Sequence, residues 1–140
     1  MLKPADFTAR AAAVRAGGMA PIVDQAIGRW FNADFIAMRR DAIAPLRAAL
    51  LSANVEGYAA TCDAIAAMDQ REGLPGIKAR TLVLAGSADI VTPTEQAEQL
   101  AKAIPGAEMV VLAGAPHIAC VEQPDAFSDR VLRFLASPTS

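Results

Sequence analysis

The sequence predicts an α/β fold in which a helical N-terminal half precedes a strand, helix, strand, helix segment. Residues 81–85 and 108–112 are short apolar runs rich in β-branched residues, which is typical of strands buried on both faces of a parallel sheet. Between them, residues 94–103 carry apolar side chains at helical spacing, and Pro105 and Gly106 end that helix. Strand, helix and strand together predict one parallel crossover unit.

Residues 5 to about 70 predict helices only, because their apolar residues recur at helical rather than alternating spacing. The expected helices are residues 5–16, a helix with Pro21 in its first turn, a turn or short helix at 34–40, a helix starting at Pro45, and a helix at 55–66. The stripe expected to be apolar after Pro45 is Leu46, Ala49 and Leu50. A Gly/Pro linker at 71–76 then divides the chain into predicted domains 1–72 and 73–140.

A final amphipathic helix is expected at residues 125–136. Its apolar face would comprise Phe127, Val131, Leu132 and Leu135, and we expect this face to close on the sheet.

One acidic residue and the one histidine of the chain each follow a predicted strand. Asp89 comes after the first strand and His117 after the second, 28 positions later (117 minus 89). Parallel strands leave their carboxyl ends at one edge of the sheet, so we expect these side chains to be hydrogen-bonded neighbours. A histidine oriented by a carboxylate handles protons in nucleophilic triads. The structural alternatives are that Asp89 forms a turn or competes with Thr92 to cap a helix, and that His117 is a surface or core group.

Composition excludes several classes of protein. The 140 residues, of which 54% are apolar and 20% charged, suffice for one domain. This apolar content indicates surface meant for a partner or for additional sequence. No apolar run approaches the roughly 18 residues of a membrane span. The net charge of −2, without charge blocks, argues against nucleic-acid binding.

The two cysteines show neither metal-ligand spacing nor a disulfide framework. We interpret Cys62 and Cys120 as reduced, mostly buried thiols of a cytoplasmic protein, and we expect no metal. Cys120 lies three residues after His117, so a reactive thiol is an alternative, although no flanking glycines support it.

Two motifs indicate a family. Residues 86–93 (GSADIVTP), together with 114–117 (GAPH) and 122–127 (EQPDAF), resemble the acid and histidine motifs of α/β-hydrolases. The resemblance implies a partial α/β-hydrolase fold, a helical cap followed by the C-terminal part of a parallel sheet, with Asp89 and His117 as catalytic residues.

Four further segments resemble the cap region of 3-oxoadipate enol-lactonases. They are residues 15–19 (RAGGM), 29–31 (RWF), 57–65 (GYAATCDAI) and 68–71 (MDQR). This resemblance implies a serine hydrolase without cofactor that opens an enol-lactone to 3-oxoadipate in aromatic-compound degradation. Such a substrate carries a carboxylate, so Arg29 and Trp30 are candidate substrate-binding residues, although surface charge and core aromatic are their commoner roles.

The sequence departs from the family in two respects, because neither a Gly-x-Ser-x-Gly nucleophile motif nor the His-Gly loop of the oxyanion hole is present. The five serines, Ser52, Ser87, Ser128, Ser137 and Ser140, lack the flanking glycines. We therefore expect a fragment that needs an N-terminal half, with self-association through exposed apolar surface. The alternatives are another α/β-hydrolase, such as an esterase, a carbon–carbon hydrolase or a dehalogenase-like protein, and a non-catalytic remnant that binds a ligand or partner.

Overall fold

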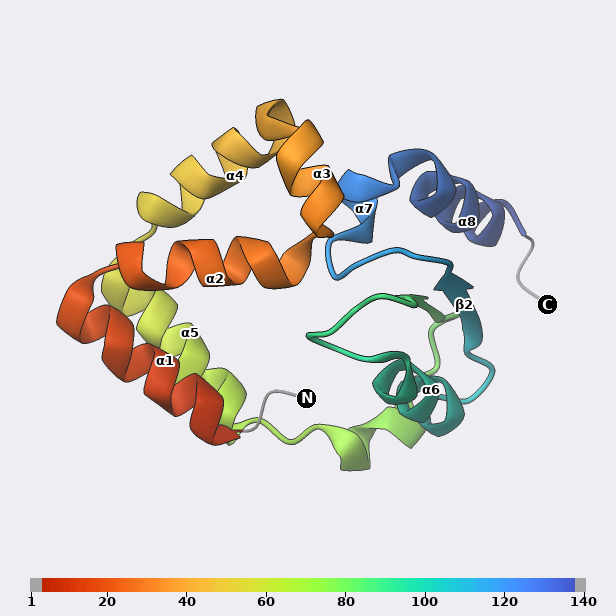
Figure 1. Ribbon diagram of the computed structural model, residues 1–140. Coiled ribbons are helices and arrows are strands. Elements are labelled where there is room, and N and C mark those ends of the chain that lie inside the picture. Colours follow the sequence, from red (N-terminus) through yellow and green to blue (C-terminus); the bar gives the residue numbers. More distant parts are fainter. Residues whose placement is uncertain (1–3, 138–140) are drawn as a thin grey trace. The chain divides into compact units, whose positions relative to one another are not determined.

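A computed structural model describes residues 4–137, which form two compact units divided between Met68 and Asp69. The expected boundary lay four residues later, between 72 and 73. Figure 1 shows the helices of the first unit and the small sheet of the second.

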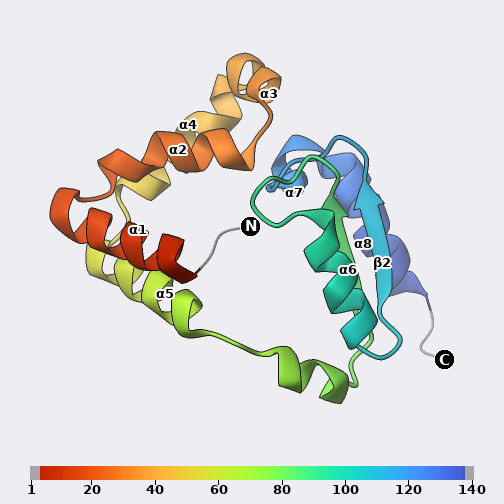
Figure 2. The same ribbon diagram turned by 60° about the horizontal axis from the view of Figure 1, so that its bottom comes forward.

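From residue 4 onward, where the structure describes it, the first unit consists of five helices. They are α1 (Pro4–Gly17), α2 (Ala20–Trp30), α3 (Ala33–Met38), α4 (Arg40–Leu51) and α5 (Val55–Ala67). Glycine ends α1 as predicted, and Gly18 adopts a φ of 70°, which favours glycine. The helices α1 and α5 lie side by side along their length (Figures 1 and 2).

The core of this unit is formed mainly by α1, α2 and α5. Val14 and Val23 are fully buried, and Ala59 and Cys62 of α5 are buried as well. On α2 the buried residues are Ile22, Val23, Ala26 and Ile27, which recur at helical spacing. Apolar residues at helical spacing therefore do face the interior here.

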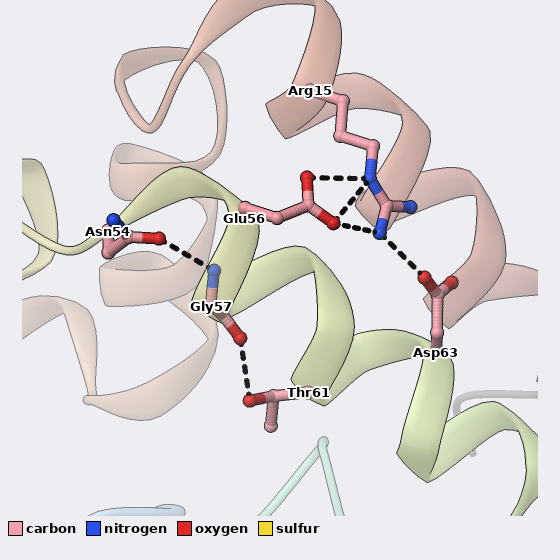
Figure 3. Close-up of polar contacts among 6 residues, drawn as sticks. All are labelled: Arg15, Asn54, Glu56, Gly57, Thr61 and Asp63. Carbon is pink, nitrogen blue, oxygen red and sulfur yellow. Dashed lines mark hydrogen bonds and ion pairs between the residues drawn. The ribbon is translucent and has the colours of Figure 1, made fainter.

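A salt-bridge cluster links α1 to α5 at the surface (Figure 3). The Arg15 guanidinium donates to the Glu56 carboxylate, at 2.7 Å from Nη2 to Oε1, and lies 2.9 Å from Asp63 Oδ2. Glu56 and Asp63 are two helical turns apart on α5, so both face α1. Asn54 caps α5 by accepting a hydrogen bond from the Gly57 N–H at 2.8 Å.

Pro45 does not start a helix, contrary to the prediction. It is the sixth residue of α4, which begins at Arg40. A proline there removes the N–H that would bond the Asp41 carbonyl, but both residues are exposed, so water can serve that carbonyl. Of the predicted apolar stripe, Leu46 and Leu50 are half-buried and Ala49 is exposed, while the one buried residue of α4 is Ile43.

The second unit is a two-stranded parallel sheet with helices on both faces. It contains a 3₁₀ turn, η1 (Arg71–Gly76), then β1 (Leu82–Gly86), α6 (Thr94–Ala103), β2 (Glu108–Leu112), α7 (Ala119–Glu122) and α8 (Pro124–Ala136). The strands pair from Leu82 with Glu108 to Gly86 with Leu112. Figure 2 shows the crossover helix α6 and the last helix α8 on opposite sides of the sheet.

Two expectations for this unit were wrong, and one helix was not anticipated. The predicted Gly/Pro linker at 71–76 contains the 3₁₀ turn η1, and the short helix α7 was not expected. The strands are only partly buried, since Val111 is 46% exposed. On α8, Phe127 packs against the buried cluster of Leu112, Ala115 and Ala119, whereas Leu132 and Leu135 are 64% and 67% exposed. A sheet of two strands offers too little surface to cover a whole helix face.

Among the described residues 4–137, no helix combines the length and apolar character needed to cross a membrane.

Candidate active site

Two loops at the carboxyl end of the sheet are tied together by three hydrogen bonds. The Ser87 N–H donates to the Leu112 carbonyl at 2.9 Å, and the Ala88 N–H donates to the Ala115 carbonyl at 2.9 Å. In the opposite direction, the Gly114 N–H donates to Ser87 Oγ at 2.7 Å. The loop after β1 and the loop after β2 are therefore held in one fixed relation.

Gly86 permits this close approach of the loops. A Cβ at this position would lie 2.1 Å from the Ala115 carbonyl oxygen, a distance that only backbone without a side chain allows. Gly114 serves the second loop differently, because its φ of 67° favours glycine. The Gln123 side-chain amide also stabilises this second loop by donating a hydrogen bond to the Ala113 carbonyl at 3.2 Å.

The two loops bring Asp89 and His117 into contact, as predicted from the strand order. His117 Nδ1 lies 2.9 Å from Asp89 Oδ2. The Asp89 side chain is 6% exposed and the His117 side chain 27% exposed, so the carboxylate is shielded while the imidazole reaches the surface. The predicted hydrogen bond is thus confirmed, while the catalytic role of the pair stays a prediction.

The carboxylate of Asp89 accepts hydrogen bonds on both oxygens. Oδ1 accepts from the Val91 N–H at 2.7 Å and the Thr92 N–H at 2.9 Å, while Oδ2 accepts from the Thr92 hydroxyl at 2.7 Å. Burial by itself raises the pKa of Asp89, but the hydrogen bonds from His117, Thr92 and Val91 outweigh burial and hold the pKa below its ordinary value. Asp89 is therefore an anion at neutral pH and fixes the proton of the imidazole on Nδ1.

With Nδ1 donating to the carboxylate, Nε2 is the imidazole nitrogen that can accept a proton.

Asp89 and His117 both border a pocket of about 360 Å³. Its walls are largely apolar and come from β1, α6, α7 and Phe127. Cys120 also lines this pocket, and its thiol is exposed, contrary to the expected burial, because α7 leaves it at the surface. Cys62 is buried in the first unit as expected, and burial raises the pKa of its thiol.

The other two predicted site residues lie at the end of α2 in the first unit. Trp30 is half-buried, and Arg29 borders a groove of about 450 Å³ between α1 and α2 that Arg10 and Gln25 also line. Among the described residues, Arg29 has no ion-pair partner. Their role in substrate binding stays a prediction.

Sequence reasoning missed two residues of the site. Thr92 bonds to Asp89, and Ser87 accepts a hydrogen bond from the second loop. The sequence signal at Thr92 favoured a helix cap, and no signal marked Ser87, because its partner is 27 residues away in the chain.

In the part of the chain that the structure describes, no group of three or more histidine, cysteine, aspartate or glutamate side chains could hold a metal ion.

Solved structures resemble this chain closely. The enol-lactonase of Burkholderia xenovorans LB400 superposes with a TM-score of 0.93 at 38% identity, covering 97% of this chain and 52% of that structure. A thermophilic esterase of Thermogutta terrifontis, solved with malate bound, superposes with a TM-score of 0.84 at 30% identity, covering 94% of this chain and 49% of the esterase.

Curated relatives that match this chain include two enol-lactonases. The chain is 39% identical over 125 residues to 3-oxoadipate enol-lactonase 2 of Acinetobacter baylyi, a match that covers 89% of this chain and 46% of the relative. The chain thus spans about half the length of the curated enol-lactonases it matches. The family model described as "TAP-like protein" matches residues 48–140. These similarities confirm the predicted partial fold, and the chain belongs to this family of α/β-hydrolases.

Proposed function

We propose that this chain supplies the cap and the acid and base residues of a serine hydrolase that opens an enol-lactone to 3-oxoadipate. The observation that carries the proposal is the 2.9 Å hydrogen bond between Asp89 Oδ2 and His117 Nδ1 at the carboxyl ends of paired parallel strands. The similarity to enol-lactonases over nearly the whole chain supports the substrate class.

In the proposed mechanism, a serine that is not among these 140 residues attacks the lactone carbonyl. His117 Nε2 takes the proton of that serine as the bond to carbon forms. The protonated imidazole then returns the proton to the departing enol oxygen. It next accepts a proton from the water that cleaves the acyl-enzyme. Asp89 keeps the ring oriented throughout and stabilises its positive charge.

Arg29 and Trp30 are proposed to contact the substrate from the cap. An arginine without an ion-pair partner among the described residues can bind the carboxylate of a keto-acid lactone, and the neighbouring indole adds apolar contact. The proposed reaction uses no metal or organic cofactor. Residues 1–72 are proposed as the cap and 73–140 as part of the core.

The test uses the chain with and without a nucleophile. The purified 140-residue chain is expected to hydrolyse enol-lactones and aryl esters no faster than background, because it carries no nucleophile motif. Co-expression with the N-terminal half of an enol-lactonase relative, which would supply the missing strands, should give lactonase activity that His117→Ala abolishes. Activity that survives His117→Ala in the completed protein would refute the proposal. Turnover by the isolated chain that Cys120→Ser removes would identify a thiol nucleophile instead.

Two other functions have specific support. Similarity to a solved esterase at 30% identity favours a carboxylic ester as substrate, which a panel of lactones and esters on the completed protein distinguishes. The absence of Gly-x-Ser-x-Gly from the sequence favours a non-catalytic protein that binds a ligand or partner. A completed protein that folds but has no activity on any substrate of the panel would support this second function.

A location in the cytoplasm is also proposed. Its support is that both cysteines are free thiols, as is usual in a reducing compartment. Self-association is proposed as well, through apolar side chains that are exposed in this chain, including Leu132 and Leu135.

A further inference from the structure

We propose that Thr92 is a positioning residue whose hydroxyl holds the Asp89 carboxylate in the orientation that keeps the His117 proton on Nδ1. Only its catalytic consequence rests on the proposed function, because the geometry and its spectroscopic readout do not depend on turnover.

The hydroxyl of Thr92 contacts both members of the pair. Its oxygen lies 2.7 Å from Asp89 Oδ2 and 3.3 Å from His117 Nδ1. A hydroxyl has a single proton, and the shorter contact to an ionised oxygen is the stronger one. The Thr92 hydroxyl therefore donates to Asp89, and its lone pairs face the Nδ1–H.

This arrangement holds both oxygens of the Asp89 carboxylate. Two backbone N–H groups hold Oδ1, and the Thr92 hydroxyl holds Oδ2 next to Nδ1. Without the hydroxyl, Oδ2 would keep only the imidazole as a partner, and the carboxylate could turn about its last torsion. With it, an Nδ1–H that tilts away from Oδ2 still meets an acceptor 3.3 Å away.

The ordinary role of a threonine at this place does not explain the contact. Thr92 precedes α6 by two residues, where a hydroxyl commonly caps a helix. Yet the N-cap of α6 is Pro93, and no side chain caps that helix. The hydroxyl is thus committed to Asp89 rather than to starting the helix.

The test is nuclear magnetic resonance of the 140-residue chain, in which His117 is the one histidine and gives unambiguous ring signals. In the wild type we expect a downfield Nδ1–H resonance. Thr92→Val should speed solvent exchange of this proton roughly five- to tenfold, the equilibrium factor of one lost hydrogen bond. It should also move the titration of the Asp89 carboxyl carbon to higher pH, since a donor to the anion is gone.

Two variants control the experiment. Thr92→Ser keeps the hydroxyl and should retain both wild-type signals. Thr81→Val removes a hydroxyl that bonds the Ala79 carbonyl in the same unit and should also leave them unchanged. If Thr92→Val does not fold, as judged by the amide spectrum of β1 and β2, Thr92→Ala carries the same expectation.

The proposal is overturned if loss of the hydroxyl changes the exchange rate by less than about twofold and leaves the Asp89 titration in place. It is also overturned if Thr92→Ser behaves like Thr92→Val, because the methyl group would then be responsible. In a completed active enzyme, Thr92→Val should lower kcat about tenfold with KM unchanged. Absence of activity in every variant would refute the proposed function and leave the spectroscopic result intact.

Discussion

Gly86→Ala should disconnect Asp89 from His117. The added Cβ would lie 2.1 Å from the Ala115 carbonyl oxygen, and real Cβ contacts essentially never fall below 3.0 Å, so that carbonyl must retreat by about 0.9 Å (3.0 minus 2.1 Å). Ala115 is fully buried and part of the loop that carries His117. A displacement of this loop by 0.9 Å along the hydrogen bond would stretch the 2.9 Å contact between Nδ1 and Oδ2 to about 3.8 Å, which is no longer a hydrogen bond.

The expected destabilisation of the second unit is about 2–5 kcal/mol. Overpacking of a close contact costs about 1–3 kcal/mol, and each hydrogen bond lost between the loops adds about 1 kcal/mol. Native-state amide exchange at β1 and β2 measures this free energy, and the His117 Nδ1–H resonance reports the pair directly.

Gly28→Ala is the matched control. Gly28 lies inside α2, and no heavy atom lies within 4 Å of a Cβ placed there. Alanine in a helix interior is favoured over glycine by about 1 kcal/mol, so this variant should stabilise the first unit. If Gly86→Ala keeps the Nδ1–H resonance and wild-type amide protection, then Gly86 is not the constraint that joins the loops.

Three further predictions concern charge and thiol chemistry. Arg15→Gln should lower the stability of the first unit slightly, and added salt should shrink the difference from wild type, because the ion pair with Glu56 is exposed (Figure 3); a salt-independent loss of stability in urea titrations would contradict this. The pKa of Asp89 is lowered in the folded state, so ionised Asp89 stabilises the fold at pH values above its ordinary pKa of 3.8. This stabilisation is lost as the pH falls from 3.8 through the folded-state pKa. Asp89→Asn should flatten that part of the acid-unfolding curve. Iodoacetamide should modify the exposed Cys120 before Cys62, whose burial shields the thiol and raises its pKa, as peptide mapping would show; faster labelling of Cys62 would disprove the assignment of burial.

The elements that carry strong local signals could be predicted closely. The bounds of α6 and β2 match the expected ranges, 94–103 and 108–112, because an apolar pattern and the stop at Pro105 and Gly106 agree there. The contact of Asp89 with His117 could also be predicted, since one crossover between parallel strands brings the two strand ends together whatever the side chains.

Features that depend on tertiary contacts could not be predicted. The amphipathic pattern of α8 does not show how much of its apolar face packs against the sheet. Leu132 and Leu135 were therefore expected to be buried, but both are exposed. The helix predicted to start at Pro45 starts at Arg40 instead, because an exposed helix tolerates the hydrogen bond that a proline cannot donate. Ser87 accepts a hydrogen bond from a loop distant in the sequence, and the Thr92 hydroxyl bonds Asp89 instead of capping a helix. Neither hydrogen bond has a recognisable pattern in the local sequence.

Three of the described serines are hydrogen-bonded elsewhere, which accords with the proposal that the nucleophile is not one of these 140 residues. Ser87, in the loop that carries Asp89, accepts the Gly114 N–H with its hydroxyl oxygen and so serves to join the two loops. Ser52 donates to Ala49 and Ser137 to Arg133, each within or at the end of its own helix. Among the described residues, none of these hydroxyls is bonded to His117. An imidazole with Nδ1 committed to a carboxylate and Nε2 available is what a base needs when its nucleophile comes from another segment.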